Sequence, residues 1–281
     1  MKQEKLNQKL FQISNYTMKR EINPKKYVSF FREIDLSAIE NIRTKYYLNG
    51  KKKPNYTAFI IKAVSQAIAE HPYTNAKIFP GFPYEKIFKF PDIHTAVACE
   101  KDSPGAEFFA FMDVIKHTDK KSIDEIQLEL NHLANATPEN NPQLKSFLSL
   151  AKNLPVFIAR QLFTLPAYLP SMWMKYRGAS LIISSPCKYG VDSISTTWPH
   201  PLGISFGLVQ KKPIVKNNKI EIVPSFTLTL CWDRCIMAGA PAARFFNSIA
   251  TNLMDQKFLE MHAGEENISK DNSIEKITAI A

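Results

Sequence analysis

Two periodicities of apolar residues run along the chain, and together they predict a mixture of helices and strands. Four apolar residues at helical spacing, from Ile60 to Ile68, predict one buried face on a helix over residues 57–71. Pro72 is expected to end this helix because it cannot continue the backbone hydrogen bonding. Residues 26–35 are instead rich in aromatic and β-branched side chains, which is typical of a strand.

The remaining predicted elements follow in a mixed order. Helices are expected over 1–12, 37–47, 122–134 and 239–257, and strands over 86–90, 93–99, 107–115, 179–185, 202–209, 213–215 and 219–231. Ser122 and Glu125 have the spacing of a capping box at the start of one helix. Because helices and strands do not alternate strictly, the order favours an α+β sandwich.

Residues 143–177 are unusually apolar for a connection and predict one or two helices with a broad hydrophobic face. Residues 263–281 are polar and predict a loose C-terminal tail. Asn217 and Asn218 are expected to form a hairpin turn between two strands. We therefore expect one domain over 1–262, with an apolar helical insertion at about 143–177, followed by the tail at 263–281.

The composition is that of an ordinary globular protein. Of the 281 residues, 45% are hydrophobic and 22% charged. The net charge of +10 comes from scattered basic residues without interleaved aromatic side chains, so we expect a solvated basic surface and no nucleic-acid partner. Such a surface is compatible with anionic ligands. The charged N-terminus lacks an apolar signal core, and we expect a cytoplasmic protein.

The four cysteines do not have the paired spacing of a zinc site, so no metal is expected. Cys231, Asp233 and Cys235 are expected to share one face of a strand. We expect reduced, buried thiols.

The segment from Phe226 to Phe246 carries a resemblance to a known family. It resembles the last strand, active-site turn and closing helix of the acyltransferase (E2) catalytic domain of 2-oxo acid dehydrogenase complexes, which shares its fold with chloramphenicol acetyltransferase. The family pattern reads Asp-His-Arg-x-x-Asp-Gly-Ala-x-Ala-Ala-Arg-Phe. Asp233 and the residues Gly239, Ala240, Ala242, Ala243, Arg244 and Phe245 match it. Further segments resemble the family in the same order, at 55–76, 92–98, 121–126 and 178–192.

The resemblance implies a two-layer α+β sandwich with a mixed sheet, assembled as a homotrimer whose active sites form between neighbouring subunits. It also implies an activity, the transfer of acyl groups between coenzyme A and a thiol acceptor. The region 143–177 is longer and more apolar than the short charged connection of the family. We expect no lipoyl domain, no lipoyl attachment site and no subunit-binding module. We therefore do not expect a complete E2.

The two residues that carry the family's chemistry differ here. Arg234 replaces the catalytic His, which acts as general base on the thiol, and Ala238 replaces the structural Asp. Arg cannot act as this base because its guanidinium stays protonated. Cys235 replaces the Arg that would pair with that Asp, while Ser184 matches the Ser that hydrogen-bonds the oxyanion.

Three functions follow as hypotheses. The first is a degenerate family member, a pseudoenzyme that binds coenzyme A or an acyl ligand, or serves as a scaffold. The second is an active coenzyme A-dependent acyltransferase with another base, for which His200 and His94 are candidates, or with Cys235 as a nucleophile whose thiolate Arg234 would favour. The third is a membrane-surface or protein-interaction module that uses the apolar segment 147–174.

Overall fold

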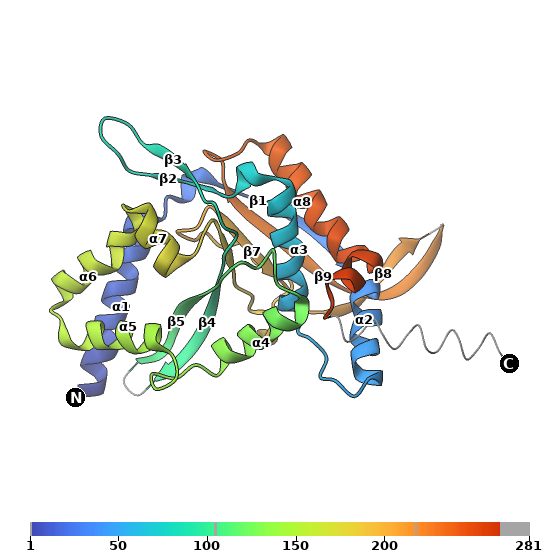
Figure 1. The fold of residues 1–281 in the computed structure, drawn as a ribbon, viewed down its shortest axis with the longest axis horizontal. Coiled ribbons are helices and arrows are strands. Elements are labelled where there is room, and N and C mark those ends of the chain that lie inside the picture. Colours follow the sequence, from blue (N-terminus) through green and yellow to red (C-terminus); the bar gives the residue numbers. More distant parts are fainter. Residues whose placement is uncertain (1, 104–105, 217, 265–281) are drawn as a thin grey trace.

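The fold has two layers, a sheet and a set of helices that covers one of its faces (Figure 1). The computed structural model describes residues 2–103, 106–216 and 218–264. Most of the buried apolar side chains lie between the two layers. No helix in these ranges is long and apolar enough to span a bilayer.

The main sheet mixes parallel and antiparallel neighbours. Its strands are β1 (Tyr27–Asp35), β4 (Thr95–Ser103), β5 (Ala106–Ile115), β6 (Leu181–Ile183), β7 (Leu202–Phe206), β8 (Gln210–Lys216) and β9 (Lys219–Asp233). They run in the order β1-β9-β7-β6-β4-β5, and β8 pairs with the outer half of β9. The pairs β4–β6 and β6–β7 are parallel and the others antiparallel. This arrangement confirms the predicted α+β sandwich with a mixed sheet. A separate hairpin joins β2 (Ala76–Phe79) to β3 (Lys86–Lys89).

The helical layer covers the face of the sheet that carries the large apolar side chains. It consists of α2 (Ser37–Leu48), α3 (Tyr56–Glu70), α4 (Ile123–Ala134), α8 (Gly239–Met254) and α9 (Gln256–His262). Phe30 of β1 lies against Trp232 of β9 and Phe246 of α8, which joins the two layers. The Ser122–Glu125 capping box is confirmed. The predicted single helix over 239–257 is wrong, because Asp255 interrupts it and caps α9.

Four helices gather at one end of the sheet, on the left of Figure 1, and we call them the helical annex. They are α1 (Lys2–Glu21), α5 (Pro142–Asn153), α6 (Val156–Thr164) and α7 (Pro170–Arg177). Leu10 and Ile13 of α1 pack against Ala151 and Ala159 in a small core of their own, which Phe147 and Phe163 extend. The predicted polar arm over 1–12 is therefore part of a longer packed helix. Residues 143–177 form three helices rather than one or two.

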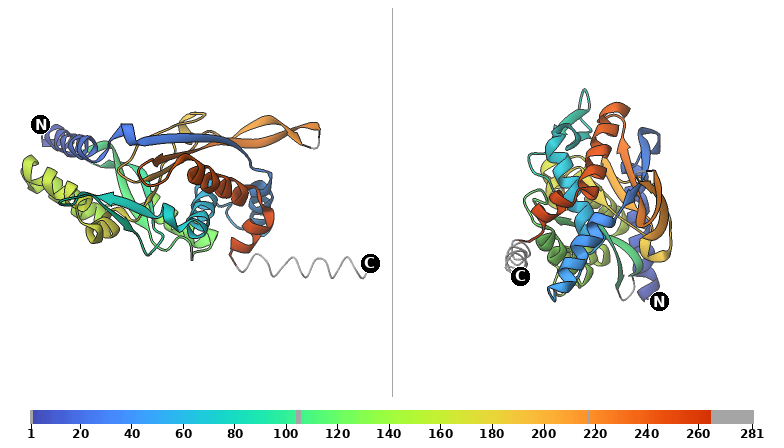
Figure 2. Two further views of the ribbon diagram at one scale, coloured as in Figure 1. Left: turned by 90° about the horizontal axis from the view of Figure 1, so that it is seen from above. Right: turned by 90° about the vertical axis from the view of Figure 1, so that its right-hand side faces the viewer.

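Short 3₁₀ turns connect several elements: η1 (Pro24–Lys26), η2 (Pro72–Thr74), η3 (Leu165–Ala167) and η4 (Cys187–Tyr189). The outer halves of β8 and β9 form a ribbon that projects at the opposite end from the annex (Figures 1 and 2). Asn218 lies in the turn between β8 and β9 and has a left-handed φ of 60°. Asn217 lies outside the described residues. Most of the predicted tail, residues 265–281, also lies outside the described residues.

Candidate functional site

The turn after β9 is held in place by main-chain hydrogen bonds. The amide of Asp233 donates to the carbonyl of Pro201 (2.9 Å), and the amide of Arg234 donates to the carbonyl of Lys26 (2.8 Å). A carboxylate oxygen of Asp233 accepts from the amide of Cys235 at 2.8 Å. The side chains of Arg234 and Cys235 take no part in these hydrogen bonds and are exposed.

Ala238 is the N-cap residue of α8 and makes no side-chain capping bond. A carboxylate at an N-cap accepts a hydrogen bond from the first turn of the helix, and a methyl group cannot. The indole of Trp232 donates to the carbonyl of Met237, the residue before this N-cap, at 3.1 Å. The first turn of α8 therefore receives no side-chain hydrogen bond from residue 238.

Ser184 lies immediately after β6, on the side of the sheet that faces away from the helical layer. Leu181 and Ile183 point into the core between the layers, so Ser184 has the opposite orientation from Ile183. Its amide donates to the Ile204 carbonyl of β7 at 3.1 Å.

Within one chain, Ser184 and Arg234 lie at opposite ends of the strands. Ser184 is level with Ile204, whereas Asp233 is level with Pro201, and β9 runs antiparallel to β7. The offset along the strands is about four residues, or roughly 13 Å, and two interstrand spacings add roughly 10 Å across the sheet. One copy of the chain therefore does not bring Ser184 and Arg234 together.

The sheet face that carries Ser184 is lined by small side chains. Ser29 on β1 and Cys231 on β9 face each other directly, and Gly203 lies beside Cys231 on β7. Part of this face is covered by the segment 190–200, whose Ser195 hydroxyl lies 2.5 Å from that of Ser29. Phe31, farther along β1, stays 54% exposed.

His200, a candidate base in the sequence, is fully buried and structural. Its Nε2 lies 2.7 Å from the carbonyl of Arg177, and its ring lies 5.0 Å from that of Trp173. Burial lowers the pKa of His200 to about 3. A ring with no access to solvent and little tendency to hold a proton does not suit a general base at neutral pH.

His94 is also buried, and it precedes β4 at the end of the sheet remote from Ser184. Its Nδ1 accepts a hydrogen bond from the amide of His117 at 3.1 Å, and its ring packs edge-on against the His117 ring. Burial lowers the pKa of His94. His94 is level with the β9 turn along the strands, but three interstrand spacings, roughly 14 Å, separate β4 from β9. The structure therefore brings His94 neither to Ser184 nor to Arg234.

The cysteine predictions require correction. Cys235 is exposed in the turn and does not share a strand face with Cys231, because β9 ends at Asp233. Partial burial and the neighbouring Asp233 carboxylate raise the pKa of Cys235, which opposes the thiolate that Arg234 was expected to favour. Cys231 is buried, while Cys99 and Cys187 are half-buried, and all four thiols are free.

A charged cluster beside the turn was not predicted from the sequence. The amine of Lys77 donates to the Pro199 carbonyl at 3.0 Å and lies 4.1 Å from the Trp173 ring centre. Burial lowers the pKa of Lys77 to about 8, against the opposing effects of Glu21 and Asp233. The sequence gives no signal for this, because Trp173 is almost a hundred residues away along the chain.

Glu21 and Arg177 belong to the same cluster and join α1 to α7 at 3.3 Å. The Glu21 side chain is only 2% exposed, and burial raises its pKa although Arg177 opposes this. No group of three or more His, Cys, Asp and Glu side chains suited to a metal ion occurs in the described part of the chain.

The family described as 2-oxoacid dehydrogenases acyltransferase (catalytic domain) matches residues 5–147 and 174–261. The chain belongs to this acyltransferase family. The match passes through the turn after β9 and leaves out 148–173, which holds the second half of α5, all of α6 and the start of α7.

Curated relatives of this family member are longer than the chain. The dihydrolipoyllysine-residue acetyltransferase component of the pyruvate dehydrogenase complex from Buchnera aphidicola subsp. Schizaphis graminum is 27% identical over 246 residues. The aligned region covers 84% of this chain and 52% of that relative. The chain thus spans about half the length of such relatives.

Solved structures agree on the fold. Azotobacter vinelandii dihydrolipoamide acetyltransferase, in which a Ser, a His and an Asn were studied for their role in catalysis, is similar with a TM-score of 0.66 and 18% identity. The cubic core of a pyruvate dehydrogenase multienzyme complex is similar with a TM-score of 0.65 and 19% identity. Each similarity covers 89% of this chain and 90% of the other.

Proposed function

We propose that this chain is a degenerate member of its family, which binds a coenzyme A thioester but does not carry out transfer through a histidine base. The observation that supports this most directly is the turn after β9. Its backbone is held by three hydrogen bonds, yet an exposed guanidinium, Arg234, occupies the position where the family has its base. A guanidinium does not accept the thiol proton at any relevant pH.

The same guanidinium is suited to holding an anion. Arg presents several N–H donors in a planar arrangement that matches a carboxylate or a phosphate. It is exposed on a turn whose position is fixed, so little order has to be gained when a ligand binds. We therefore assign to Arg234 a role in binding the phosphates or the acyl carboxylate of the ligand.

The proposed site requires a second copy of the chain. Ser184 and Arg234 are separated within one chain, and Ser184 faces the sheet side that the helical layer does not cover. A homotrimer that places this face against the β9 turn of its neighbour would complete the site. The similarity to a structure of a cubic multienzyme core supports an assembled state.

In this proposal, residues 1–262 form the catalytic-type domain and about 143–177 form an insertion in it. The gap in the family match between residues 147 and 174 supports the insertion. Ser184 would donate a hydrogen bond to the thioester oxygen, and Ala238 would leave the turn without the family's carboxylate.

The second candidate function, an active acyltransferase with another base, is favoured by one observation. Lys77 donates to the carbonyl of Pro199, two residues before the Pro201 carbonyl that holds the Asp233 amide, and burial lowers its pKa to about 8, which leaves a fraction of neutral amine at physiological pH. A lysine with a lowered pKa is able to take up a proton. Among the alternatives, this residue suits a base better than His200, His94 or Cys235.

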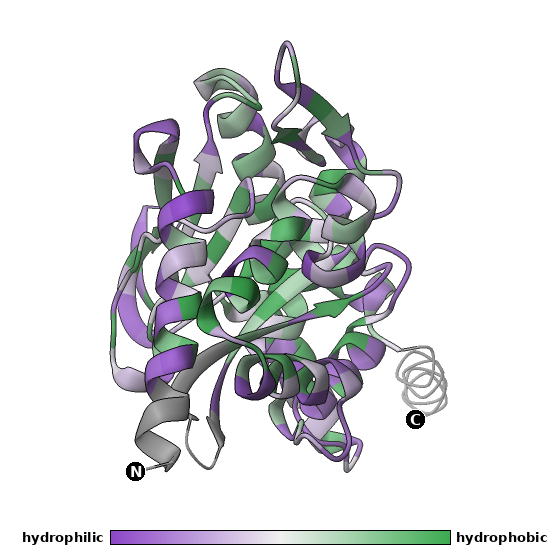
Figure 3. Cartoon of the chain, turned by 90° about the vertical axis from the view of Figure 1, so that its left-hand side faces the viewer, coloured by the Kyte–Doolittle hydropathy of each residue, from purple (hydrophilic) through white to green (hydrophobic). Residues whose placement is uncertain are grey.

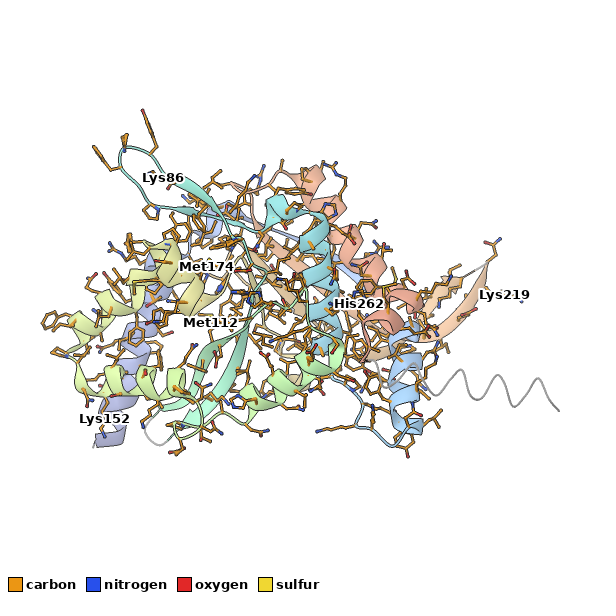
Figure 4. The ribbon with its side chains drawn as sticks, in the orientation of Figure 1. Lys86, Met112, Lys152, Met174, Lys219 and His262 are labelled. Atoms are coloured by element: carbon orange, nitrogen blue, oxygen red, sulfur yellow. The ribbon has the colours of Figure 1, made fainter. Side chains whose placement is uncertain are left out.

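The test of the first proposal is coenzyme A binding measured by calorimetry. We expect saturable binding to the wild type and a loss of affinity of at least fivefold in Arg234→Ala. The matched control is Lys152→Ala, which removes a cation from α5 at the far end of the molecule (Figure 4) and is expected to bind within twofold of the wild type. Sedimentation of the same samples is expected to give the mass of a trimer.

Equal affinity for coenzyme A in the wild type, Arg234→Ala and Lys152→Ala would show that Arg234 does not contact the ligand. A monomer at micromolar concentration would contradict a site completed by a neighbouring subunit. If Lys77→Met abolishes a measurable thioester turnover while coenzyme A still binds, the second function replaces the first.

A further inference from the structure

Helix α6 of the annex is apolar on both of its sides. Ala159 and Phe163 pack into the small core that the annex shares with α1. On the other side, Phe157, Ile158 and Leu162 are exposed. A surface helix ordinarily presents polar residues to water opposite its buried stripe, so this second apolar side is unusual.

The exposed apolar side continues beyond α6. Leu165 in η3 and Leu169 at the start of α7 follow Ile158 and Leu162 at intervals of three or four residues. The five side chains Phe157, Ile158, Leu162, Leu165 and Leu169 are 37% to 70% exposed. We call them the annex stripe. Figure 3 views this end of the molecule, where hydrophobic segments of the helices face the viewer.

The stretch of chain that contains the annex stripe carries charged side chains of one sign only. No acidic residue occurs between Glu139 and Asp192, although the chain has 26 acidic residues in all. Six basic residues fall in the same interval: Lys145, Lys152, Arg160, Lys175, Arg177 and Lys188. Arg177 is paired with Glu21 and Lys188 with Glu100, whereas Lys145, Lys152 and Lys175 are exposed on the annex helices α5 and α7. Apolar side chains beside exposed lysines match the interface of a bilayer that contains anionic lipid.

The annex holds the stripe in a fixed orientation. Arg177 of α7 pairs with Glu21 of α1 and also donates to the Phe163 carbonyl of α6 at 3.0 Å. Lys9 of α1 donates to the Lys152 carbonyl at the end of α5. These contacts tie the four helices together, so docking would not require the annex to be rebuilt.

We propose that the annex stripe docks this protein on an anionic membrane surface. The stripe would enter the boundary between headgroups and acyl chains while the flanking lysines contact lipid phosphates. This mode of attachment needs no spanning helix, and none in the described ranges is long and apolar enough to be one. The inference rests on the annex alone and does not depend on the proposed function of the β9 turn.

The test is flotation of the full chain with phosphatidylcholine vesicles, with or without about 30 mol% phosphatidylglycerol. We expect binding to the anionic vesicles, binding at least tenfold weaker to the neutral ones, and weakening as salt is raised. The variant Ile158→Glu with Leu162→Glu is expected to lose binding by at least tenfold. These positions are exposed, so the variant is expected to fold, and its circular dichroism spectrum checks this.

The matched control places the same charges on another exposed apolar surface. Ile220 and Ile222 of the β8–β9 ribbon are 75% and 72% exposed and lie at the opposite end from the annex, next to Lys219 in Figure 4. We expect Ile220→Glu with Ile222→Glu to bind vesicles within twofold of the wild type. Equal loss in both variants would show a general charge effect and overturn the assignment to the annex.

Two other results would overturn the proposal. One is absence of binding to anionic vesicles. The other is a wild-type assembly that the annex variant dissociates without any change in vesicle binding, which would identify the stripe as a contact between copies of the chain.

Discussion

Replacement of His200 by Gln is expected to make the free energy of unfolding less sensitive to acid. In the folded protein burial keeps the ring neutral and lowers its pKa from an ordinary value of 6.5 to about 3, although the hydrogen bond between Nε2 and the Arg177 carbonyl opposes this. In the unfolded chain the same ring takes up a proton below about pH 6.5. Between these values the unfolded state binds more protons than the folded state, so stability falls as the pH falls.

The magnitude follows from the size of this interval. Each pH unit below 6.5 costs about 1.4 kcal/mol of unfolding free energy, which gives about 2 kcal/mol at pH 5. The contribution is complete above pH 6.5, where neither state is protonated. His200→Gln is expected to be about 1–3 kcal/mol less stable than the wild type at pH 8, because the packing against Trp173 changes. That difference is expected to shrink by about 2 kcal/mol at pH 5, because Gln does not titrate.

The assay is urea unfolding of both proteins at pH 8, 6.5 and 5, followed by tryptophan fluorescence. Protein concentration is held constant because assembly contributes to apparent stability. If wild type and His200→Gln lose the same stability between pH 8 and pH 5, the ring is free to take a proton in the folded state. That result would refute the structural role of His200 and restore it as a candidate base.

Three further predictions concern the β9 turn and the charged cluster. Arg234→His with Ala238→Asp is expected to raise acetyl transfer to dihydrolipoamide less than tenfold, since Cys235 stands where that Asp would need its ion-pair partner; a hundredfold gain, about 2.7 kcal/mol of barrier, would show that only the base is missing. Glu21→Gln is expected to lower the unfolding free energy by about 3 kcal/mol, because it removes the negative charge that is paired with the largely buried Arg177 guanidinium, and a change below about 0.5 kcal/mol in urea would contradict this. Cys235 is expected to react with iodoacetamide more slowly at pH 7.5 than a free thiol, because its pKa is raised, with Cys235→Ser as the control; faster labelling would show a thiolate instead.

Local patterns in the sequence predict much of the fold. The apolar spacing from Ile60 to Ile68 identifies α3, and the Ser122–Glu125 pair identifies the start of α4, because both signals depend on neighbours within one or two turns. Local sequence patterns do not predict the packing of α1 on α5 and α6. It depends on contacts between residues more than a hundred positions apart.

In the candidate site, too, the sequence predicts the features that depend on local contacts and not those that depend on distant ones. The motif around Asp233 predicts the turn and the start of α8, whose hydrogen bonds are local. The burial of His200 and Lys77 is set by Trp173, which reaches both from α7. Residue type alone therefore made His200 a candidate base, and it gave no reason to single out Lys77.

The most direct test of the proposed degenerate site is steady-state acetyl transfer from acetyl-coenzyme A to dihydrolipoamide by the wild-type protein. The concentration of acetyl-coenzyme A is set to a value that saturates the protein in calorimetry. We expect a rate within twofold of the reaction without protein, because Arg234 cannot remove the thiol proton. Turnover on the order of 1 s⁻¹ or faster, within the ordinary range of enzymes, would contradict it.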